Sequence, residues 1–127
     1  MNKQIVAGIY DAFGRGDLAA VLGALSEDVI WNMPGPAPFA GKRTGLAAVQ
    51  QFFMDLLGAV KIEDFAVHVI TGDGDHVVVL GHELCTVHAT GKSYQQLWAH
   101  AYTLKDGKVT EALLLEDTHA QAVAFAA

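Results

Sequence analysis

The side chains best suited to chemistry lie together between Gly91 and Leu104. Trp98, His100 and Tyr102 alternate there with small or aliphatic residues, and this two-residue period predicts a β-strand. Since successive side chains of a strand point to opposite faces, the three rings share one face. An imidazole titrates near neutral pH, and aromatic rings supply apolar walls with polar tips. This face therefore suits an organic ligand held in a cavity.

His100 is the strongest candidate for proton transfer, because the reference pKa of histidine suits acid–base catalysis at pH 7. The alternative is a core histidine that is satisfied by one neighbour. Glu83 precedes a turn at Thr90-Gly91, and counting back through that turn places Glu83 near His100 across a hairpin. We therefore predict a hydrogen bond between Glu83 and His100 that orients the imidazole.

A third catalytic candidate, Asp117, ends the last predicted strand. The alternative role for Asp117 is the N-cap of a short C-terminal helix, a position that Asp favours. Glu116 and Asp117 point to opposite faces if the strand is regular, so only one of them can face a cavity. The sequence alone leaves open which one does.

Aromatic and apolar residues elsewhere predict the walls of this cavity, although each could instead be an ordinary core residue. Tyr10, on the first predicted helix, could also donate a hydrogen bond to a ligand oxygen. Phe39 ends a loop, residues 34–39, that contains all three prolines, and it could close the cavity at its rim. The predicted substrate-binding residues are Tyr10, Trp31, Met33, Phe39, Phe53, Trp98 and Tyr102.

Hydrophobic spacing predicts helices first and strands afterwards. One helix ends at Gly14, a second is capped by Asp17 and a third ends at Gly58, with an extended segment at Val29–Met33 between the last two. Turn sequences then separate four strands, which predicts an antiparallel meander. The predicted strands are Ile62–Ile70, His76–His88, Ser93–Leu104 and Val109–Glu116.

This order of elements predicts an α+β fold, in which a strongly curved antiparallel sheet wraps around the N-terminal helices as a cone. Such a cone leaves a blind cavity wherever the inward side chains do not fill its interior. We expect the mouth of that cavity near the proline loop and the C-terminus.

Composition limits the classes of function. The 127 residues, 13.5 kDa in mass, are expected to form a single domain, residues 1–127. With 52% hydrophobic and 17% charged residues, the chain has apolar surface to spare for a pocket or an oligomer interface, and we expect a homodimer. The net charge of -6 argues against binding to nucleic acid. Without a long apolar run or a signal-like start, we expect no membrane association and a cytoplasmic location.

Metal and thiol chemistry are not expected. Cys85 is the only cysteine, and its place in a predicted strand suggests a buried, inert thiol. The histidines are poorly spaced for one ion, since His82 and His88 share a strand face but lie six residues apart. We expect the histidines other than His100 on the outer face of the sheet, namely His68, His76, His82, His88 and His119.

Several short motifs, taken in order, resemble the SnoaL-like and ketosteroid-isomerase-like branch of the nuclear transport factor 2 fold superfamily. The resemblance covers nearly the whole chain. The matching pieces are Gly16-Asp17, Asp28-Val29-Ile30-Trp31, Pro34-Gly35-Pro36, Phe39-Ala40-Gly41, Gly45, Thr90-Gly91-Lys92, Trp98-Ala99-His100, Asp106-Gly107-Lys108 and Asp117-Thr118.

The resemblance implies a cone-shaped, cystatin-like α+β roll that usually forms a homodimer through its outer sheet face. Members of this superfamily isomerise, cyclise, hydrate or hydrolyse small hydrophobic substrates without a metal or organic cofactor, while others only bind or assemble. Ketosteroid isomerase uses an Asp base with a Tyr and a protonated Asp. The corresponding positions here hold Met33, Ile9 and His100, so that mechanism is not expected. Trp98-Ala99-His100 and Asp117 resemble the strand and C-terminal signature of the SnoaL-like cyclases better. In related epoxide hydrolases an acid at the closing strand helps to activate water, and the resemblance implies that Asp117 could take this role.

We therefore expect a cofactor-independent acid–base enzyme of the isomerase, cyclase or hydrolase type. His100 would move the proton, assisted by Glu83 or Asp117, on a small hydrophobic carbonyl, polyketide-like or epoxide-like substrate. The alternative is a noncatalytic small-molecule-binding or dimerisation domain of the same fold. An open pocket in which His100 and an acid converge would favour the enzyme, and a pocket filled by aromatic rings would favour the alternative.

Overall fold

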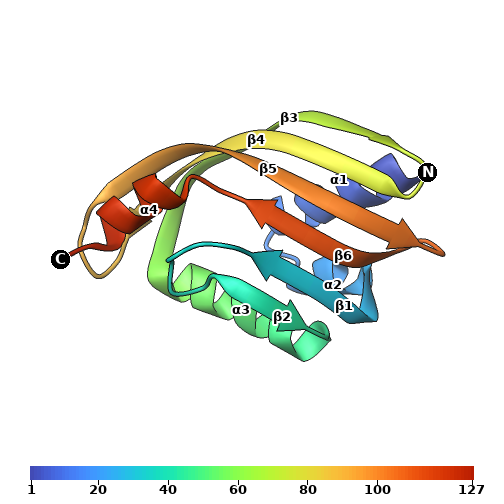
Figure 1. The fold of residues 1–127 in the computed structure, drawn as a ribbon, viewed down its shortest axis with the longest axis horizontal. Helices are drawn as coiled ribbons and strands as arrows, with labels where there is room; N and C mark the ends of the chain where they lie inside the picture. The colour runs from blue at the N-terminus through green and yellow to red at the C-terminus, as the bar shows by residue number, and fades with distance from the viewer.

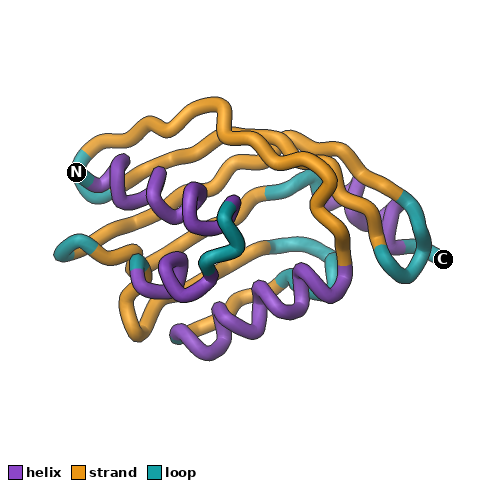
Figure 2. The backbone as a smooth tube through the Cα atoms, turned by 180° about the vertical axis from the view of Figure 1, so that it is seen from behind, coloured by secondary structure: helices purple, strands orange, loops and turns teal.

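A curved sheet wraps around three helices in the computed structural model, which describes all residues 1–127 (Figures 1 and 2). Helices α1, α2 and α3 cover the concave face, and α4 lies against β5 at the C-terminal end. The predicted α+β cone is confirmed. The elements are α1 Asn2–Gly14, α2 Leu18–Gly23, β1 Leu25–Met33, β2 Gly41–Thr44, α3 Leu46–Ala59, β3 Val60–Asp73, β4 His76–Val87, β5 Ser93–Lys105, β6 Lys108–Leu115 and α4 Thr118–Phe125.

The sheet has the strand order β2-β1-β6-β5-β4-β3. Strands β3 to β6 form the predicted antiparallel meander, and β1 adds to it by parallel pairing with β6, Trp31 lying opposite Ala112. Strand β2, which was not among the predicted strands, pairs antiparallel with β1. Its four residues, Gly41–Thr44, lie at the sheet edge and are largely exposed, so they lack the apolar alternation that marks a strand in the sequence.

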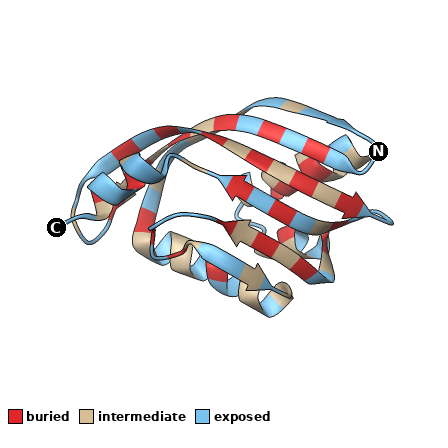
Figure 3. Cartoon of the chain, viewed as in Figure 1, coloured by how far each residue is buried: buried red, intermediate tan, exposed pale blue.

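One face of the central hairpin is buried, as the alternating bands of Figure 3 show. On β5 the inward residues include Gln96, Trp98, His100 and Tyr102, which confirms the shared face predicted for the three rings. The register places Val79 opposite His100, Gly81 opposite Trp98 and Glu83 opposite Gln96. The hairpin therefore presents an imidazole, an amide and a carboxyl to the interior of the cone.

Local interactions hold the helices against this face. Asp17 caps α2 as predicted, because its Oδ1 accepts a hydrogen bond from the backbone N–H of Ala20 at 3.0 Å. Arg43 ties β2 to α3 through a 3.0 Å ion pair with Asp55, and its guanidinium also lies over the ring of Phe52. None of the helices is long and apolar enough to cross a membrane.

Close packing at Gly81 gives a test of the central hairpin. A Cβ atom there would collide with the ring of Trp98 and with the carbonyl oxygen of Ala66. We expect Gly81→Ala to lower the free energy of unfolding by about 1–3 kcal/mol, as overpacking does. The control is Gly8→Ala on α1, where a Cβ meets nothing within 4 Å; it should raise stability by up to about 1 kcal/mol. Urea unfolding measures both changes, and an unchanged Gly81→Ala midpoint would contradict this packing.

Candidate active site

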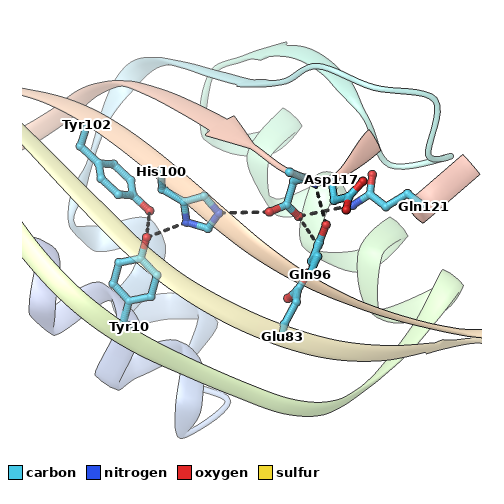
Figure 4. A network of polar contacts seen from close by, with 8 residues as sticks. Tyr10, Glu83, Gln96, His100, Tyr102, Asp117 and Gln121 are labelled. Carbon is cyan, nitrogen blue, oxygen red and sulfur yellow. Dashed lines mark hydrogen bonds and ion pairs between the residues drawn. The ribbon is translucent and has the colours of Figure 1, made fainter. Parts of the chain in front are cut away.

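A chain of polar side chains crosses the interior of the cone (Figure 4). The Oη atoms of Tyr102 and Tyr10 lie 2.7 Å apart, and Tyr10 Oη lies 2.7 Å from Nδ1 of His100. On the far side of the imidazole, Nε2 of His100 lies 3.5 Å from Oε2 of Glu116. The side chains of His100 and Glu116 are only 11% and 5% exposed. The imidazole thus stands between a phenol and a buried carboxyl.

Two glutamines hold the acidic end of this chain. Nε2 of Gln96 donates to Oε1 of Glu83 at 2.6 Å and to Oε1 of Glu116 at 3.2 Å. Gln121 on α4 makes a longer, 3.5 Å contact with the same Glu116 oxygen. The backbone N–H of Asp117 donates to Oε1 of Gln96 at 2.8 Å. Since the Gln96 oxygen is occupied in this way, its NH₂ group must face the two carboxyls.

Burial shifts the proton affinities of these groups in opposite directions. Desolvation lowers the pKa of His100 to about 3, partly opposed by the charge of Glu83, so the imidazole is neutral at pH 7. Desolvation raises the pKa values of Glu83 and Glu116 to about 7. Burial also raises the pKa values of Tyr10 and Tyr102, so both phenols keep their protons. At neutral pH the site therefore holds a neutral imidazole, two O–H donors and carboxyls that can exchange a proton.

The polar chain borders an apolar cavity of about 60 Å³, and the residues lining it are hydrophobic except for a few polar groups at one end. His100, Glu116 and Glu83 supply that polar end. A wider vestibule of about 740 Å³ shares part of its lining with the inner cavity, including Tyr10 and Phe13. A ligand that entered through the vestibule would reach the polar end last.

The mouth of the cavity lies elsewhere than the sequence suggested. Residues of α1, the α1–α2 turn, α2, α3 and β3 line the vestibule, and neither the proline loop nor α4 does. At the expected mouth, the ring of Phe39 instead packs against Phe52 and Phe125, with centroid distances of 6.2 and 6.0 Å. Phe125 belongs to α4, so the C-terminal helix seals the end of the cone that we expected to be open.

Of the three predicted catalytic residues, two lie at the cavity and one does not. His100 lies at the cavity as expected. Glu83 is buried there too, but the predicted hydrogen bond to His100 is wrong, because the hairpin register sets Glu83 opposite Gln96. Asp117 is exposed and caps α4, accepting from the N–H of Ala120 at 2.9 Å, so its alternative role is the correct one. Glu116 is the acid that faces the cavity.

Most of the predicted wall residues line the cavity, namely Tyr10, Trp31, Met33, Phe53 and Tyr102. Two do not. Phe39 is fully buried in the core described above. Trp98 is buried and stacks on two rings that line the cavity, its ring centroid 4.1 Å from that of His100 and 5.1 Å from that of Phe65. Trp98 therefore packs against the imidazole instead of forming the cavity wall.

Two residues of the site were missed by the sequence analysis. Gln96 shares the inward face of β5 with His100, and a glutamine in an apolar alternation was a signal that it needs a buried partner. Gln121 is 1% exposed and comes from α4, where no periodic pattern pointed to the cavity.

Metal-binding groups are not clustered in this structure: no three His, Cys, Asp or Glu side chains are arranged to hold an ion. His68 and His82 lie on the outer side of β3 and β4 with their ring nitrogens 2.5 Å apart, and Nε2 of His82 also lies 3.0 Å from Oδ2 of Asp64. His76 also lies on the outer side of β4, as expected. His88 and His119 do not, because they belong to the turn after β4 and to α4.

Cys85 is buried and unpaired, and burial raises the pKa of its thiol to about 12.

Comparison with known proteins agrees with this architecture. The SnoaL-like domain profile matches residues 6–112, and the chain therefore belongs to the SnoaL-like family. A nuclear transport factor 2-like protein from Burkholderia xenovorans LB400 is 32% identical, with a TM-score of 0.91 over 98% of this chain and 95% of that one. No curated protein matches the chain.

Two further solved structures share the fold at lower identity. TerC, co-crystallised with polyporic acid, is 24% identical with a TM-score of 0.83, covering 97% of this chain and 96% of that one. A proposed polyketide cyclase from Xanthomonas campestris pv. campestris is 22% identical with a TM-score of 0.78, covering 99% and 100%. At these identities the likeness establishes the fold alone.

The buried carboxyls make a prediction about stability. Because the folded protein keeps their protons to a higher pH than the unfolded chain does, they lower the free energy of unfolding as the pH rises from about 4.5 to 7. His100 acts in the opposite sense between about pH 3 and 6.5, where only the unfolded chain binds its proton. Glu116→Gln removes one of these carboxyls. The free energy of unfolding of the variant minus that of wild type should therefore increase by on the order of 1 kcal/mol for each pH unit between pH 4.5 and 7.

Urea unfolding of both proteins over a series of pH values measures this difference. Glu111→Gln is the matched control, since it removes an exposed carboxyl from β6 and leaves the buried pair intact. A stability difference between Glu116→Gln and wild type that does not change with pH would contradict the burial of an ionisable Glu116.

Proposed function

We propose that this protein is a cofactor-independent acid–base enzyme, of the isomerase, cyclase or hydrolase type, that acts on a small and largely apolar carbonyl, polyketide-like or epoxide-like compound. The observation that carries the proposal is the contact between His100 and Glu116 at the end of an otherwise apolar cavity. Proton-transfer groups facing an apolar pocket are the arrangement that such chemistry requires.

Glu116, with its raised pKa, is the better general base of the two. A catalytic base works best when its pKa lies near the operating pH, and burial brings the carboxyl toward that range while it takes the imidazole of His100 away from it. His100 then acts as a neutral partner that orients the carboxyl. If Tyr10 donates to Nδ1, the remaining ring proton is on Nε2 and faces Glu116.

The tyrosine pair supplies the electrophilic part of this mechanism. Tyr102 has Tyr10 as its hydrogen-bond partner, so it can redirect its O–H to a ligand oxygen while Tyr10 keeps its bond to His100. In an isomerisation, Glu116 would take a proton from the carbon next to a carbonyl. The electron pair would move to the carbonyl oxygen, which the phenol stabilises, and the proton would return to another carbon. The same carboxylate could instead take a proton from a water molecule that attacks an epoxide carbon. The C–O bond of the epoxide would break, and the released oxygen, stabilised by the phenol, would take up the proton from Glu116.

The charges around the vestibule favour an uncharged substrate. Asp11, Glu63 and Asp64 contribute to its lining, and no lysine or arginine does. Lys61 lies 3.7 Å from Glu63 and offsets part of its charge, and His82 lies 3.0 Å from Asp64. The remaining negative potential would repel carboxylates and phosphates. Among similar structures, the proposed polyketide cyclase and the protein co-crystallised with polyporic acid agree with an organic ligand.

A noncatalytic binding domain is the second candidate, and the size of the inner cavity favours it. At about 60 Å³ that cavity is smaller than the roughly 300–1,000 Å³ of ordinary ligand pockets. A ligand would have to lie mainly in the vestibule, with only its reactive group at Glu116. A binding domain would hold that ligand unchanged.

Exchange of carbon-bound hydrogen distinguishes the two candidates. We expect wild-type protein in D₂O to exchange the hydrogens next to the carbonyl in members of a panel of small apolar cyclic enones, followed by proton NMR. Glu116→Gln should lose about 10² to 10⁴-fold in exchange rate, the usual contribution of positioned proton transfer. Asp117→Asn keeps the α4 cap and should exchange at the wild-type rate.

Two results would contradict this assignment. Equal exchange by wild type and Glu116→Gln would remove Glu116 as the base. Enones that bind to the wild-type protein, as seen in its own NMR spectrum, without any exchange would support the noncatalytic candidate.

A homodimer that forms through the outer sheet face is part of the proposal. Leucines on the outer side of β4, β5 and β6 are exposed, and Leu97 is 74% exposed. Sedimentation velocity should therefore give twice the mass of one chain, and Leu97→Lys should shift the protein toward monomer. Val123→Lys, at an exposed position of α4, should leave the dimer intact. A wild-type monomer at micromolar concentration would contradict this interface.

A further inference from the structure

The buried carboxyls of Glu83 and Glu116 share the side-chain amide of Gln96, next to the contact between Glu116 and His100 (Figure 4). Nε2 of Gln96 lies 2.6 Å from Oε1 of Glu83 and 3.2 Å from Oε1 of Glu116, so the two carboxyl oxygens are within a few ångströms of each other. Gln96 is 3% exposed and Glu83 is 7% exposed. Glu83 does not touch His100 through a hydrogen bond, and the mechanism above gives it no task.

The orientation of the amide is fixed from outside the pair. The N–H of Asp117 occupies Oε1 of Gln96, so the two N–H groups of Gln96 are directed to the glutamates. Asp117 is itself held in place as the cap of α4. The end of β6 therefore sets both the position of Glu116 and the direction of the amide that joins it to Glu83.

Nothing near the pair would neutralise two negative charges. No lysine or arginine forms an ion pair with either carboxyl, and the neutral His100 is the nearest basic group. α4 contributes the uncharged Gln121, and β1 and α3 contribute apolar side chains. The titratable groups around the pair are His100, Tyr94 and Tyr102 on β5, Cys85 on β4 and Tyr10 on α1. Two like charges this close in an apolar site cannot both form at low cost.

We propose that Glu83 and Glu116 hold one proton between them, and that Gln96 is the positioning residue that joins them. The inference deepens the proposed function and rests on it only for what the proton is used for. Before the reaction Glu83 is protonated and Glu116 is the carboxylate, so the pair carries one negative charge. When Glu116 takes a proton from a substrate, that charge passes to the substrate oxygen, and it returns to Glu116 when the proton goes back to carbon. Glu83 keeps its proton throughout, which avoids the formation of a second buried charge beside Glu116.

Carbon-13 NMR of protein labelled at the carboxyl carbon of glutamate tests this without any substrate. In wild type, the two buried carboxyls should titrate in two steps more than about one pH unit apart, the separation that marks a proton shared by two sites. The exposed Glu27, Glu63 and Glu111 provide the internal reference. The proposal would be overturned if the two buried carboxyls titrated over the same pH range as these exposed glutamates.

Two variants should change the titration in opposite directions. Glu83→Gln removes the like charge, so Glu116 should titrate in a single step at lower pH than the upper step of wild type. Gln96→Met removes both amide donors, so the upper step should move to higher pH. Gln51→Met is the matched control, because Gln51 donates to the exposed Asp55 at 2.8 Å and lies away from the pair. A shift of both variants in the same direction would contradict a positioning role, and the wild-type titration decides the matter if a variant does not fold.

Failure of this inference differs from failure of the proposed function. If the two carboxyls titrate in separate steps but the enones do not exchange hydrogen, the proposed enzyme activity is contradicted and the shared proton is supported. If the carboxyls titrate in a single step and the enones do exchange hydrogen, the shared proton is contradicted and Glu116 acts as an isolated base.

Discussion

The removal of water from His100 and Glu116 is the constraint on which the site depends. In water, imidazole binds a proton more tightly than a carboxylate does, and burial reverses that order by disfavouring the charged form of each. The rings that surround the pair are therefore part of its chemistry as well as its support. Trp98 stacks 4.1 Å from the imidazole and excludes solvent on that side. An open cavity with the same polar groups would contain an ordinary histidine and an ordinary glutamate.

The curved sheet brings together groups that are distant in the chain. Strand β5 carries Gln96 and His100 on one face, and β4 places Glu83 opposite the first of these. Glu116 follows directly after β6, and Tyr10 comes from α1 on the other side of the imidazole. Because four separate elements contribute, no short motif contains the site. The SnoaL-like fold supplies the arrangement, and the particular side chains decide what it can do.

The parts of this arrangement that follow from local periodicity could be predicted from the sequence. The two-residue period between Gln96 and Tyr102 placed the rings on one buried face, and helical spacing located the helices. Contacts between strands could not be predicted in the same way, because they depend on register. Glu83 lies opposite Gln96, and His100 stands two inward positions further along β5, so a count through the turn gave the wrong hydrogen-bond partner. The choice between Glu116 and Asp117 depended on where β6 ends, which the cap of α4 determines.

The protonation state of His100 tests the central claim most directly. Nitrogen-15 NMR of the labelled protein reports the charge and tautomer of each imidazole ring as the pH changes. At pH 5 a free imidazole is charged, whereas His100 should remain neutral there, because burial lowers its pKa to about 3. A His100 ring that gains its proton near pH 6.5 would show that water reaches the site, and the account of a buried acid–base pair would be wrong.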